Sequence, residues 1–219
     1  MARPARVSPD RILAAAALEF SERGFAGARV DRIARRAHVN KAMLYYHFKS
    51  KNGIYRTLLR QMFTRVAARL PHIADGEGSH AEKLDRVIAS LAEFIGEHAF
   101  FPAIMLREVA EGGVHLDRET LTALAAVPSV VGGIVQQGVK ARAFRAVPPM
   151  FAYFTMFAPI VFYSAGARIR KEIAQLDVVP AAPGVPGADW ADSSTGGFIR
   201  HMQHTTRRSL ARVDHARTS

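Results

Sequence analysis

Residues 40–51 of this 219-residue chain read NKAMLYYHFKSK, and this stretch decides the fold. Asn40 can accept a backbone N–H and so begin a helix. Leu44 and Phe48 lie four residues apart, which places them on one helix face where they can anchor the helix to a core. The stretch therefore predicts a short helix over about 41–47 with one buried face.

Polar and aromatic side chains on the same helix can meet a polyanion. Lys41, Tyr45 and His47 can face away from the core. Ser50 can cap a second helix, and Lys51 stands in the first turn of that helix. A helix N-terminus beside a lysine is a ready site for an anion. This pattern is typical of the recognition helix of a DNA-binding domain.

The positive charge of the chain is concentrated near its N-terminus. The formal net charge is +11, and residues 1–60 contain 13 Lys or Arg against 4 Asp or Glu. Residues 61–219 contain 17 against 15 and are close to neutral. A basic segment joined to a near-neutral body favours a polyanion as partner. A solvated basic surface is the alternative, but the pattern of residues 40–51 favours the polyanion.

Composition argues against several other classes of protein. The chain has no cysteine, which excludes disulfides and thiolate metal sites and fits a reducing cytoplasm. We find no apolar stretch of the roughly 18 residues that a membrane helix needs, so we expect no membrane partner. The basic residues 1–6 are not followed by an apolar signal core, so we expect no export and a cytoplasmic location.

Apolar residues recur with helical spacing along the chain, and no strand pattern of comparable strength is present. The run Ser-Pro-Asp at 8–10 is a strong helix start, and Gly24 ends that helix. Pro159 is expected to kink the helix that contains it. Residues 177–197 are rich in Pro, Gly and Ala and predict a connector. We expect helices over about 9–23, 30–37, 41–47, 51–70, 80–97, 101–112, 116–140, 149–171 and 196–213.

A helix, a helix-turn-helix and a fourth helix that leads into a helical body together resemble the TetR family of bacterial repressors. The resemblance covers Arg11 to about Leu59. Its most specific parts are IARRA at 33–37, VNK at 39–41 and LYYHFKSK at 44–51. It implies an all-α fold, in which an N-terminal three-helix DNA-binding domain with a helix-turn-helix joins a helical-bundle domain for ligand binding and dimerisation.

The resemblance also implies a domain layout and a function. We expect a flexible basic arm at 1–7, a DNA-binding domain at 8–53 that extends into a connecting helix at 51–70, and a helical ligand-binding and dimerisation domain at 71–219. Members of the family are typically homodimers that bind a palindromic operator and release it when a small molecule binds. We therefore expect a ligand-responsive repressor with a hydrophobic or aromatic effector. The alternative is a ligand-independent or architectural DNA-binding protein with the same DNA-binding domain.

The resemblance assigns DNA contacts to individual residues. Lys41 can donate to guanine O6 and N7, and Ala42 can touch a thymine methyl group. Tyr46, His47 and Lys51 would hold phosphates, and Lys51 would do so through its ammonium and the helix N-terminus. The full set of expected contacts is Arg29, Val30, Arg32, Lys41, Ala42, Met43, Tyr45, Tyr46, His47 and Lys51.

The turn before the recognition helix departs from the family pattern at His38, where members usually have Gly. Histidine tolerates a positive φ better than most residues, but at some cost. The imidazole could add a phosphate contact, or the turn could simply be strained.

The second half of the chain is rich in aromatic residues and methionine, and we expect most of these in its core. A fraction is expected to line a cavity between helices, together with a few polar groups. Candidates for that pocket are Phe94, His98, Phe101, Met105, Arg107, Glu108, Tyr153, Phe154, Phe157 and Tyr163. The last two helices would form the dimer interface if the resemblance holds. The candidates for this interface are Phe157, Val161, Ala165, Phe198, Met202, Thr206 and Leu210.

No pattern in the sequence indicates catalysis or metal binding. Ser193-Ser194 lacks a Gly-x-Ser-x-Gly context. Glu108, Glu111 and His115 could converge, but the break at Gly112-Gly113 argues against it. We therefore expect neither an enzyme nor a cofactor or metal site.

Overall fold

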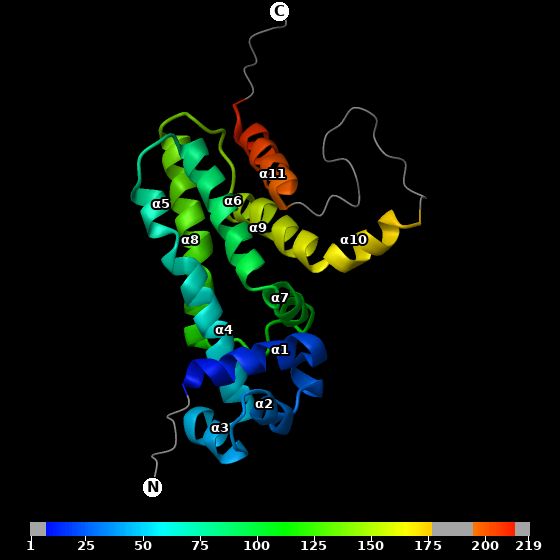
Figure 1. Ribbon diagram of the computed structural model, residues 1–219. Helices are drawn as coiled ribbons and strands as arrows, with labels where there is room; N and C mark the ends of the chain where they lie inside the picture. Colours follow the sequence, from blue (N-terminus) through cyan, green and yellow to red (C-terminus); the bar gives the residue numbers. More distant parts are fainter. Residues whose placement is uncertain (1–7, 177–194, 213–219) are drawn as a thin grey trace, which may run out of the picture. The chain divides into compact units, whose positions relative to one another are not determined.

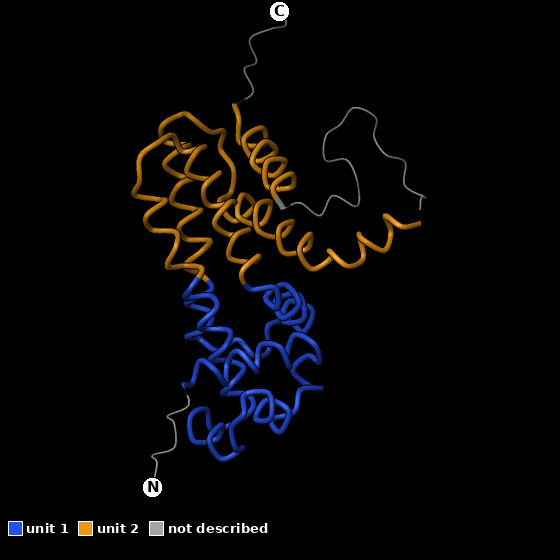
Figure 2. The backbone as a smooth tube through the Cα atoms, viewed as in Figure 1, with its two compact units in different colours: residues 1–65, 98–124 blue, residues 66–97, 125–219 orange. Residues whose placement is uncertain are grey.

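The computed structural model describes residues 8–176 and 195–212, and every regular element within these ranges is an α-helix (Figure 1). The chain divides into two compact units (Figure 2). Unit 1 comprises residues 1–65 and 98–124, and unit 2 comprises residues 66–97 and 125–219. Unit 1 thus includes more of the chain than the expected DNA-binding domain at 8–53. The all-α fold class expected from the sequence is confirmed.

Unit 1 begins with α1 (Pro9–Gly27), which starts as the sequence predicts and extends past the expected end at residue 23. The Ser8 hydroxyl accepts the backbone N–H of Asp10 at 3.2 Å, and Pro9 occupies the first turn. Gly24 has a φ of 68°, which interrupts the helical geometry, and the Ala28 N–H donates to the Gly24 carbonyl at 3.2 Å. The chain can therefore turn sharply toward the next helix.

The remaining helices of unit 1 pack around α1. They are α2 (Val30–Arg36), α3 (Lys41–Phe48), α7 (Phe101–Ala110) and the first parts of α4 (Lys51–Ala68) and α8 (Arg118–Lys140). α1 packs against α2 and α7, and α2 packs against α3. Burying their apolar faces stabilises the unit by about 25 cal/mol per Å² of apolar surface removed from water. The core side chains include Ile12, Ala16, Phe20, Ile33, Leu44, Ile54, Leu59 and Phe101, each at most 1% exposed.

Unit 2 contains α5 (Pro71–Asp75), α6 (His80–Glu97), α9 (Pro149–Ala165), α10 (Ala167–Ala174) and α11 (Thr195–Leu210), with the last parts of α4 and α8. α6 packs against α9, and α11 packs against both of them. Asp85 of α6 accepts the Arg207 Nε of α11 at 2.7 Å. The core side chains include Val87, Ile88, Leu91, Val131, Val135, Met156 and Ile160, each at most 1% exposed.

Helix boundaries in unit 2 also differ from the expectation. The helix expected at 149–171 continues through Pro159 and ends at Gly166, where α9 and α10 meet at 59°. The helix expected at 51–70 ends at Ala68, and Pro71 begins a further short helix, α5, that was not expected. The expected arm at 1–7 and residues 177–194 of the expected connector, with Ser193-Ser194, lie outside the described residues.

The expectation that no stretch of the chain is long and apolar enough for a membrane is wrong for α8. By length and composition alone, this 23-residue helix could cross a membrane, with a mean hydropathy of 1.3 over an 18-residue window. The bent pairs α6 with α7 and α9 with α10 also pass this test. Between Glu119 and Lys140, α8 has only apolar, small and uncharged polar residues. Its side chains Val127, Val131 and Val135 are buried within the described protein.

Candidate nucleic-acid interface

The helix-turn-helix of unit 1 forms as the sequence predicts. The Asn40 Oδ1 accepts the backbone N–H of Met43 at 2.8 Å and begins α3. Leu44 is fully buried and Phe48 is 8% exposed, so these two side chains anchor α3 to the core. At Gly53 the backbone of α4 lies close to the end of α3, since an added Cβ would lie 1.9 Å from the Phe48 carbonyl oxygen. The absent side chain thus allows α3 and α4 to join closely.

The surface of α2 and α3 presents most of the expected contact residues. Tyr45 is 41% exposed and Tyr46 is 72% exposed, so both rings are accessible from solvent. Arg29, Lys41 and Ala42 are also exposed. The half-buried members of the set are Val30, Arg32, Met43, His47 and Lys51.

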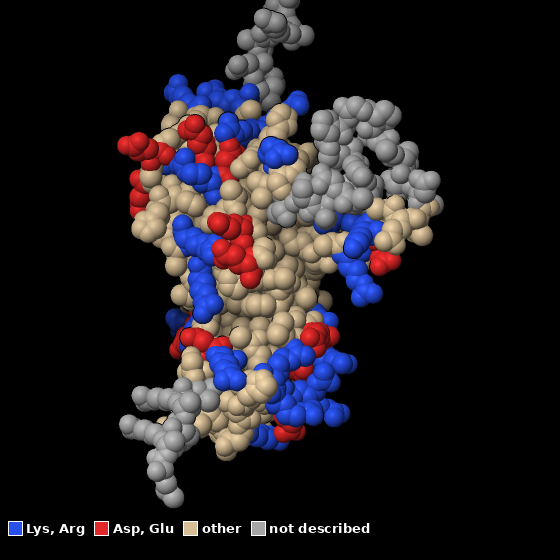
Figure 3. Space-filling model, in the orientation of Figure 1, with Lys and Arg blue, Asp and Glu red and all other residues tan. Residues whose placement is uncertain are grey.

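Lysine and arginine side chains gather over α2 and the end of α1 in Figure 3. Arg23, Arg29 and Arg35 are exposed there, and Arg36 forms a two-pronged ion pair with Glu22 at 3.1 Å. The hydrogen bond and charge of Arg36 lower the pKa of the Glu22 carboxyl. The face is therefore positive, and part of its charge is already paired within the chain.

Lys41 is held by an acidic residue that the sequence analysis did not single out. Its ammonium lies 2.8 Å from the Asp31 carboxylate of α2. The hydrogen bond and charge of Lys41 lower the pKa of Asp31, and Asp31 in turn raises the pKa of Lys41. Both side chains are well exposed, so the pair is solvated and Lys41 can exchange its partner. Asp31 thereby orients the side chain that was expected to reach a base.

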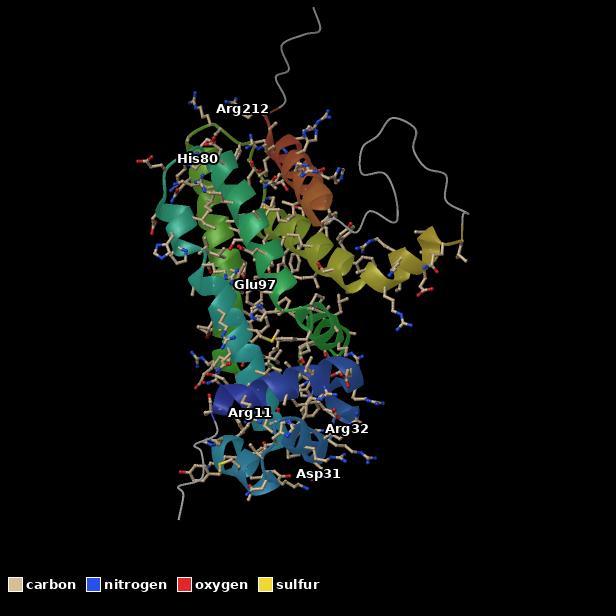
Figure 4. The ribbon with its side chains drawn as sticks, in the orientation of Figure 1. Arg11, Asp31, Arg32, His80, Glu97 and Arg212 are labelled. Atoms are coloured by element: carbon tan, nitrogen blue, oxygen red, sulfur yellow. The ribbon has the colours of Figure 1, made fainter. Side chains whose placement is uncertain are left out.

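Arg32 was expected to contact DNA, but in the structure it pairs with an acidic residue of α1. Its Nε lies 3.1 Å from the Glu19 carboxylate, which is fully buried and also accepts the Arg29 backbone N–H at 3.4 Å. Figure 4 shows Arg32 and Asp31 side by side on α2. A buried carboxylate requires such partners. Glu19 therefore fixes the start of α2, a role that its place in an apolar helical stretch did not reveal.

The Lys51 ammonium is not directed at an anion site, so the expectation that it clamps a phosphate is corrected. It donates to the carbonyls of Phe25 at 2.8 Å, Ala28 at 3.2 Å and Ala26 at 3.3 Å. It also lies 4.6 Å from the centre of the Phe25 ring. The three donors of the ammonium are thus used on carbonyls at the end of α1. Lys51 joins α4 to α1 rather than facing outward.

The turn at His38 is left-handed, with a φ of 52°. His38→Gly is expected to raise the free energy of unfolding by about 0.5–1 kcal/mol, because glycine removes the Cβ clash but adds backbone entropy to the unfolded chain. Urea denaturation followed by circular dichroism measures the change. His38→Ala is the control, since alanine keeps the strain and should give no gain. A glycine variant no more stable than the alanine variant would contradict this account.

Glu108, expected in a ligand pocket, forms a buried network instead. It is 1% exposed and accepts the Tyr55 hydroxyl at 3.0 Å and the His115 backbone N–H at 3.0 Å. The His115 Nδ1 lies 3.2 Å from Glu108 and 3.6 Å from Glu111, and its ring lies 4.1 Å from the Phe25 ring. Burial and the nearby Glu108 charge raise the pKa of Tyr55. The network joins the α7–α8 turn to α4 and to the end of α1.

The sequence also predicted that Glu108, Glu111 and His115 would not converge, and this prediction is wrong. One ligand atom from each lies within 4.8 Å of the others, because the turn through Gly112 and Gly113 at positive φ folds His115 back onto α7. Both oxygens of Glu108 already have hydrogen-bond donors within the chain. The cluster therefore serves as an internal contact of unit 1.

The expected ligand-pocket residues do not come together in one described cavity. Phe101, Met105, Arg107, Glu108 and His98 belong to unit 1, whereas Phe94, Tyr153, Phe154, Phe157 and Tyr163 belong to unit 2. Of the ten, only His98 lines the described cavity of about 270 Å³ in unit 1.

Several of these residues have other surroundings. Phe154 is 55% exposed, so it lies on the surface. Tyr163 of α9 stacks flat on Phe198 of α11 with ring centres 3.9 Å apart, and the Arg170 guanidinium lies 3.5 Å from its centre. This stack joins three helices of unit 2. Tyr153 is 5% exposed, and burial raises the pKa of its hydroxyl.

Most of the expected dimer-interface residues are buried within their own chain, among the helices of unit 2. Phe198 is half-buried in the stack with Tyr163, and Ala165 is exposed. α11 is amphipathic, but its apolar side faces α6 and α9 of the same unit. The side chains that are at most 9% exposed are Phe157, Val161, Met202, Thr206 and Leu210.

The opposite side of α9 carries an exposed apolar stripe, which we call the α9 face. It consists of Phe151, Phe154, Ala158, Phe162 and Ala165, which recur every three or four residues and so share one side of the helix. Phe151 is 65% exposed and Phe162 is 73% exposed. All five are exposed within the described part of the chain.

Comparison with known proteins agrees with the geometry of unit 1. Residues 12–58 match the family described as bacterial regulatory proteins, tetR family. The HTH-type transcriptional repressor NicS of Pseudomonas putida is 28% identical over 188 residues, or 83% of this chain and 85% of the relative. The HTH-type transcriptional regulator RutR of Escherichia coli is 28% identical over 171 residues, or 74% and 80%.

Solved structures share the fold over nearly the whole chain. A transcriptional regulator FadR from Bacillus subtilis, solved in complex with stearoyl-CoA, has a TM-score of 0.70 at 16% identity and covers 93% of this chain and 100% of its own. The regulator PfmR from Thermus thermophilus has a TM-score of 0.65 at 21% identity and covers 94% and 98%. At such identities the likeness is one of fold.

Proposed function

Because this chain belongs to the TetR family of bacterial transcriptional regulators, a family of DNA-binding proteins rather than enzymes, we propose that it binds a palindromic operator as a homodimer and releases it when a small molecule binds. The observation that carries this proposal is the exposed surface of α3. A capped helix with two buried anchors presents Lys41, Ala42, Tyr45 and Tyr46 to solvent. An exposed helix of this kind fits the major groove of DNA.

The proposed contacts divide by chemistry. Lys41 and Ala42 in the first turn of α3 read base edges, and Tyr45 lies beside them. Tyr46 and His47 contact phosphates, and the start of α2 meets the backbone through the Arg29 side chain. His47 lies edge-on to the Tyr46 ring, with ring centres 5.2 Å apart, so the two side chains support one another. Arg32 and Lys51 act through the packing of α1 instead.

The α9 face supports the proposed dimer. A soluble protein rarely exposes a contiguous stripe of large apolar side chains without a partner. In a two-fold dimer the same patch meets itself, so an apolar helix face can pair with its own copy. Ala158 lies between Phe154 and Phe162, Ala165 ends the stripe, and both leave room for close approach of the two helices. The interface moves from the buried residues expected from the sequence to this exposed side of α9.

The effector is proposed to be a small apolar or aromatic molecule. In mechanism, it favours a conformation in which the two recognition helices no longer fit major grooves about 34 Å apart. It can shift that equilibrium only by its differential affinity for the two conformations. The solved complex of a fold relative with stearoyl-CoA supports a ligand with a large apolar part.

Lys41→Ala is expected to weaken operator binding by about 1–3 kcal/mol and to relax specificity at one base pair, because it removes a base contact. Electrophoretic shift on the operator and on single-base variants measures both effects. Lys171→Ala, which removes an exposed lysine of α10, is the matched control and should bind as the parent does. An equal loss on matched and mismatched sites would assign Lys41 to phosphate instead.

Selection of bound fragments from bacterial genomic DNA, followed by footprinting, tests the proposed function. The proposal expects a protected site with two inverted half-sites whose centres are about one DNA turn apart. A footprint without inverted symmetry would contradict the dimer, and recovery of no enriched sequence would contradict the operator.

A further inference from the structure

A cavity of about 270 Å³ in unit 1 lies outside the proposed DNA-contacting surface and the α9 face. It is bounded by α1, by α4 and by the segment that precedes α7. All of its lining residues belong to the same compact unit. They are Asp10, Leu13, Ala14, Ala17, Leu58, Gln61, Met62, Arg65, His98 and Phe100.

The wall of this cavity is mostly apolar. Leu13, Ala17, Leu58 and Met62 are at most 4% exposed, so they form a closed floor between α1 and α4. Phe100 adds a half-buried aromatic ring from the segment before α7. Pockets for drug-sized ligands occupy roughly 300–1,000 Å³. The cavity therefore suits the apolar part of a smaller molecule.

The lining also includes the charged side chains of Asp10 and Arg65 and the imidazole of His98. Asp10 lies in the first turn of α1, where the positive end of the helix offsets its charge, and it accepts the Gln61 Nε2 at 3.4 Å. Arg65 is exposed and has no acidic partner among the residues that the structure describes. Its guanidinium is thus available to bind a planar anion with two parallel hydrogen bonds.

We propose that this cavity binds a small monocarboxylate with an aliphatic or aryl-alkyl body. The body lies on the floor formed by Leu13, Leu58 and Met62, and the carboxylate pairs with Arg65. The site is separate from the ligand-pocket residues of unit 2 expected from the sequence. Binding here is independent of DNA, whereas its role as an effector site rests on the proposed function.

The position of the cavity explains how a ligand would act on DNA binding. α1 carries Glu19, which fixes the start of α2. α4 carries Lys51, which holds the end of α1. A ligand between Leu13 of α1 and Leu58 of α4 bears on both helices that support the helix-turn-helix. Binding of ligand and operator is then coupled, and each weakens the other by the same factor.

Isothermal titration of the full chain with hydrocinnamate and with octanoate tests the binding. Saturable binding of these acids is expected, with much weaker binding of the corresponding primary amides. Arg65→Gln should weaken the affinity for both acids by about 10- to 100-fold, and Arg65→Lys should restore part of that affinity. Arg118→Gln, an exposed arginine of the same unit outside the cavity, is the matched control. Absence of binding, or equal binding of acid and amide, would overturn the proposal.

A second variant tests the place of binding without removing a charge. Ala14 lines the cavity but is exposed, so Ala14→Leu can fill it while the core and the helix are retained. This variant should no longer bind hydrocinnamate or octanoate, and its circular dichroism spectrum should match that of the parent. Unchanged binding would place the ligand elsewhere and overturn the proposal.

The coupling is measured as operator affinity with and without octanoate. Weaker operator binding in the parent, with no change in Ala14→Leu, supports an effector site here. An operator affinity that octanoate leaves unchanged would overturn the effector role. A chain that binds acids but no DNA sequence selectively would contradict the proposed function and leave the cavity site standing. Selective DNA binding without any binding of acids would contradict the cavity site alone.

Discussion

Phe162→Asp is expected to leave the protein monomeric and to weaken operator binding by about 100- to 10,000-fold. Phe162 is 73% exposed on the α9 face, so an aspartate there costs the monomer little. In the dimer it would place two carboxylates in an apolar contact, where burying unpaired charge is strongly unfavourable. Each recognition helix would then bind its half-site alone, and the gain from linking two binding events would be lost.

Sedimentation equilibrium and electrophoretic shift measure the two effects. Val109→Asp is the matched control, because Val109 is 64% exposed on α7, outside the α9 face. The control should remain dimeric and bind the operator as the parent does. Circular dichroism melting checks that both variants fold. A dimeric Phe162→Asp variant with normal operator affinity would place the interface elsewhere.

Lys51→Met is expected to lower the free energy of unfolding by about 2–3 kcal/mol, because a hydrogen bond to a charged group contributes about 1.5–3 kcal/mol. Methionine keeps the apolar stem of the side chain but cannot donate to the carbonyls of Phe25, Ala26 and Ala28. The end of α1 would then lose its partners. Urea denaturation, followed by far- and near-ultraviolet circular dichroism, measures this loss of free energy.

Lys49→Met is the matched control for that variant. Lys49 is exposed two residues earlier, and within the described part of the chain its ammonium donates to the Tyr46 carbonyl alone, at 3.2 Å. Its backbone has a φ of 66°, which both lysine and methionine must adopt, so the strain cancels. The control should lose well under 1 kcal/mol. Equal losses in the two variants would return Lys51 to the role of a surface phosphate ligand.

Local signals in the sequence were sufficient for the helix-turn-helix. Ser8 and Asn40 act as caps through bonds within three residues of themselves, and Leu44 and Phe48 share a face by spacing alone. Such features do not depend on how the rest of the chain packs. The positive φ at His38 was foreseeable for the same reason, since a glycine-type turn position was occupied by another residue.

Contacts between distant segments could not be predicted from the sequence. Lys51 reaches carbonyls 23 to 26 residues away, and Tyr55 meets Glu108 53 residues away. Glu19 is an acid among the buried apolar residues of α1, and only the fold shows that α2 covers it. The one indication in the sequence was a charged residue on an apolar helix face, since such a residue is rarely buried unless it is paired.

The proposed dimer surface could not be predicted from the sequence because α9 is apolar on nearly every side. Spacing cannot tell which side of such a helix meets its own chain and which remains open. The apolar side of α11 was visible in the sequence, but it packs on α6 and α9 of the same unit. Only the solvent exposure of each side chain in the folded protein tells the open side of α9 from its packed side. On the open side lie Phe151, Phe154 and Phe162.

The ratio of affinities for a selected operator and for a scrambled duplex of equal length tests the central claim most directly. Both are measured with the parent chain at ~150 mM salt, where non-specific phosphate binding is weak. A dimer that reads bases through α3 predicts an operator bound at least about 1,000-fold more tightly, with two chains per duplex. Equal affinities for the two duplexes at that salt concentration would contradict the account.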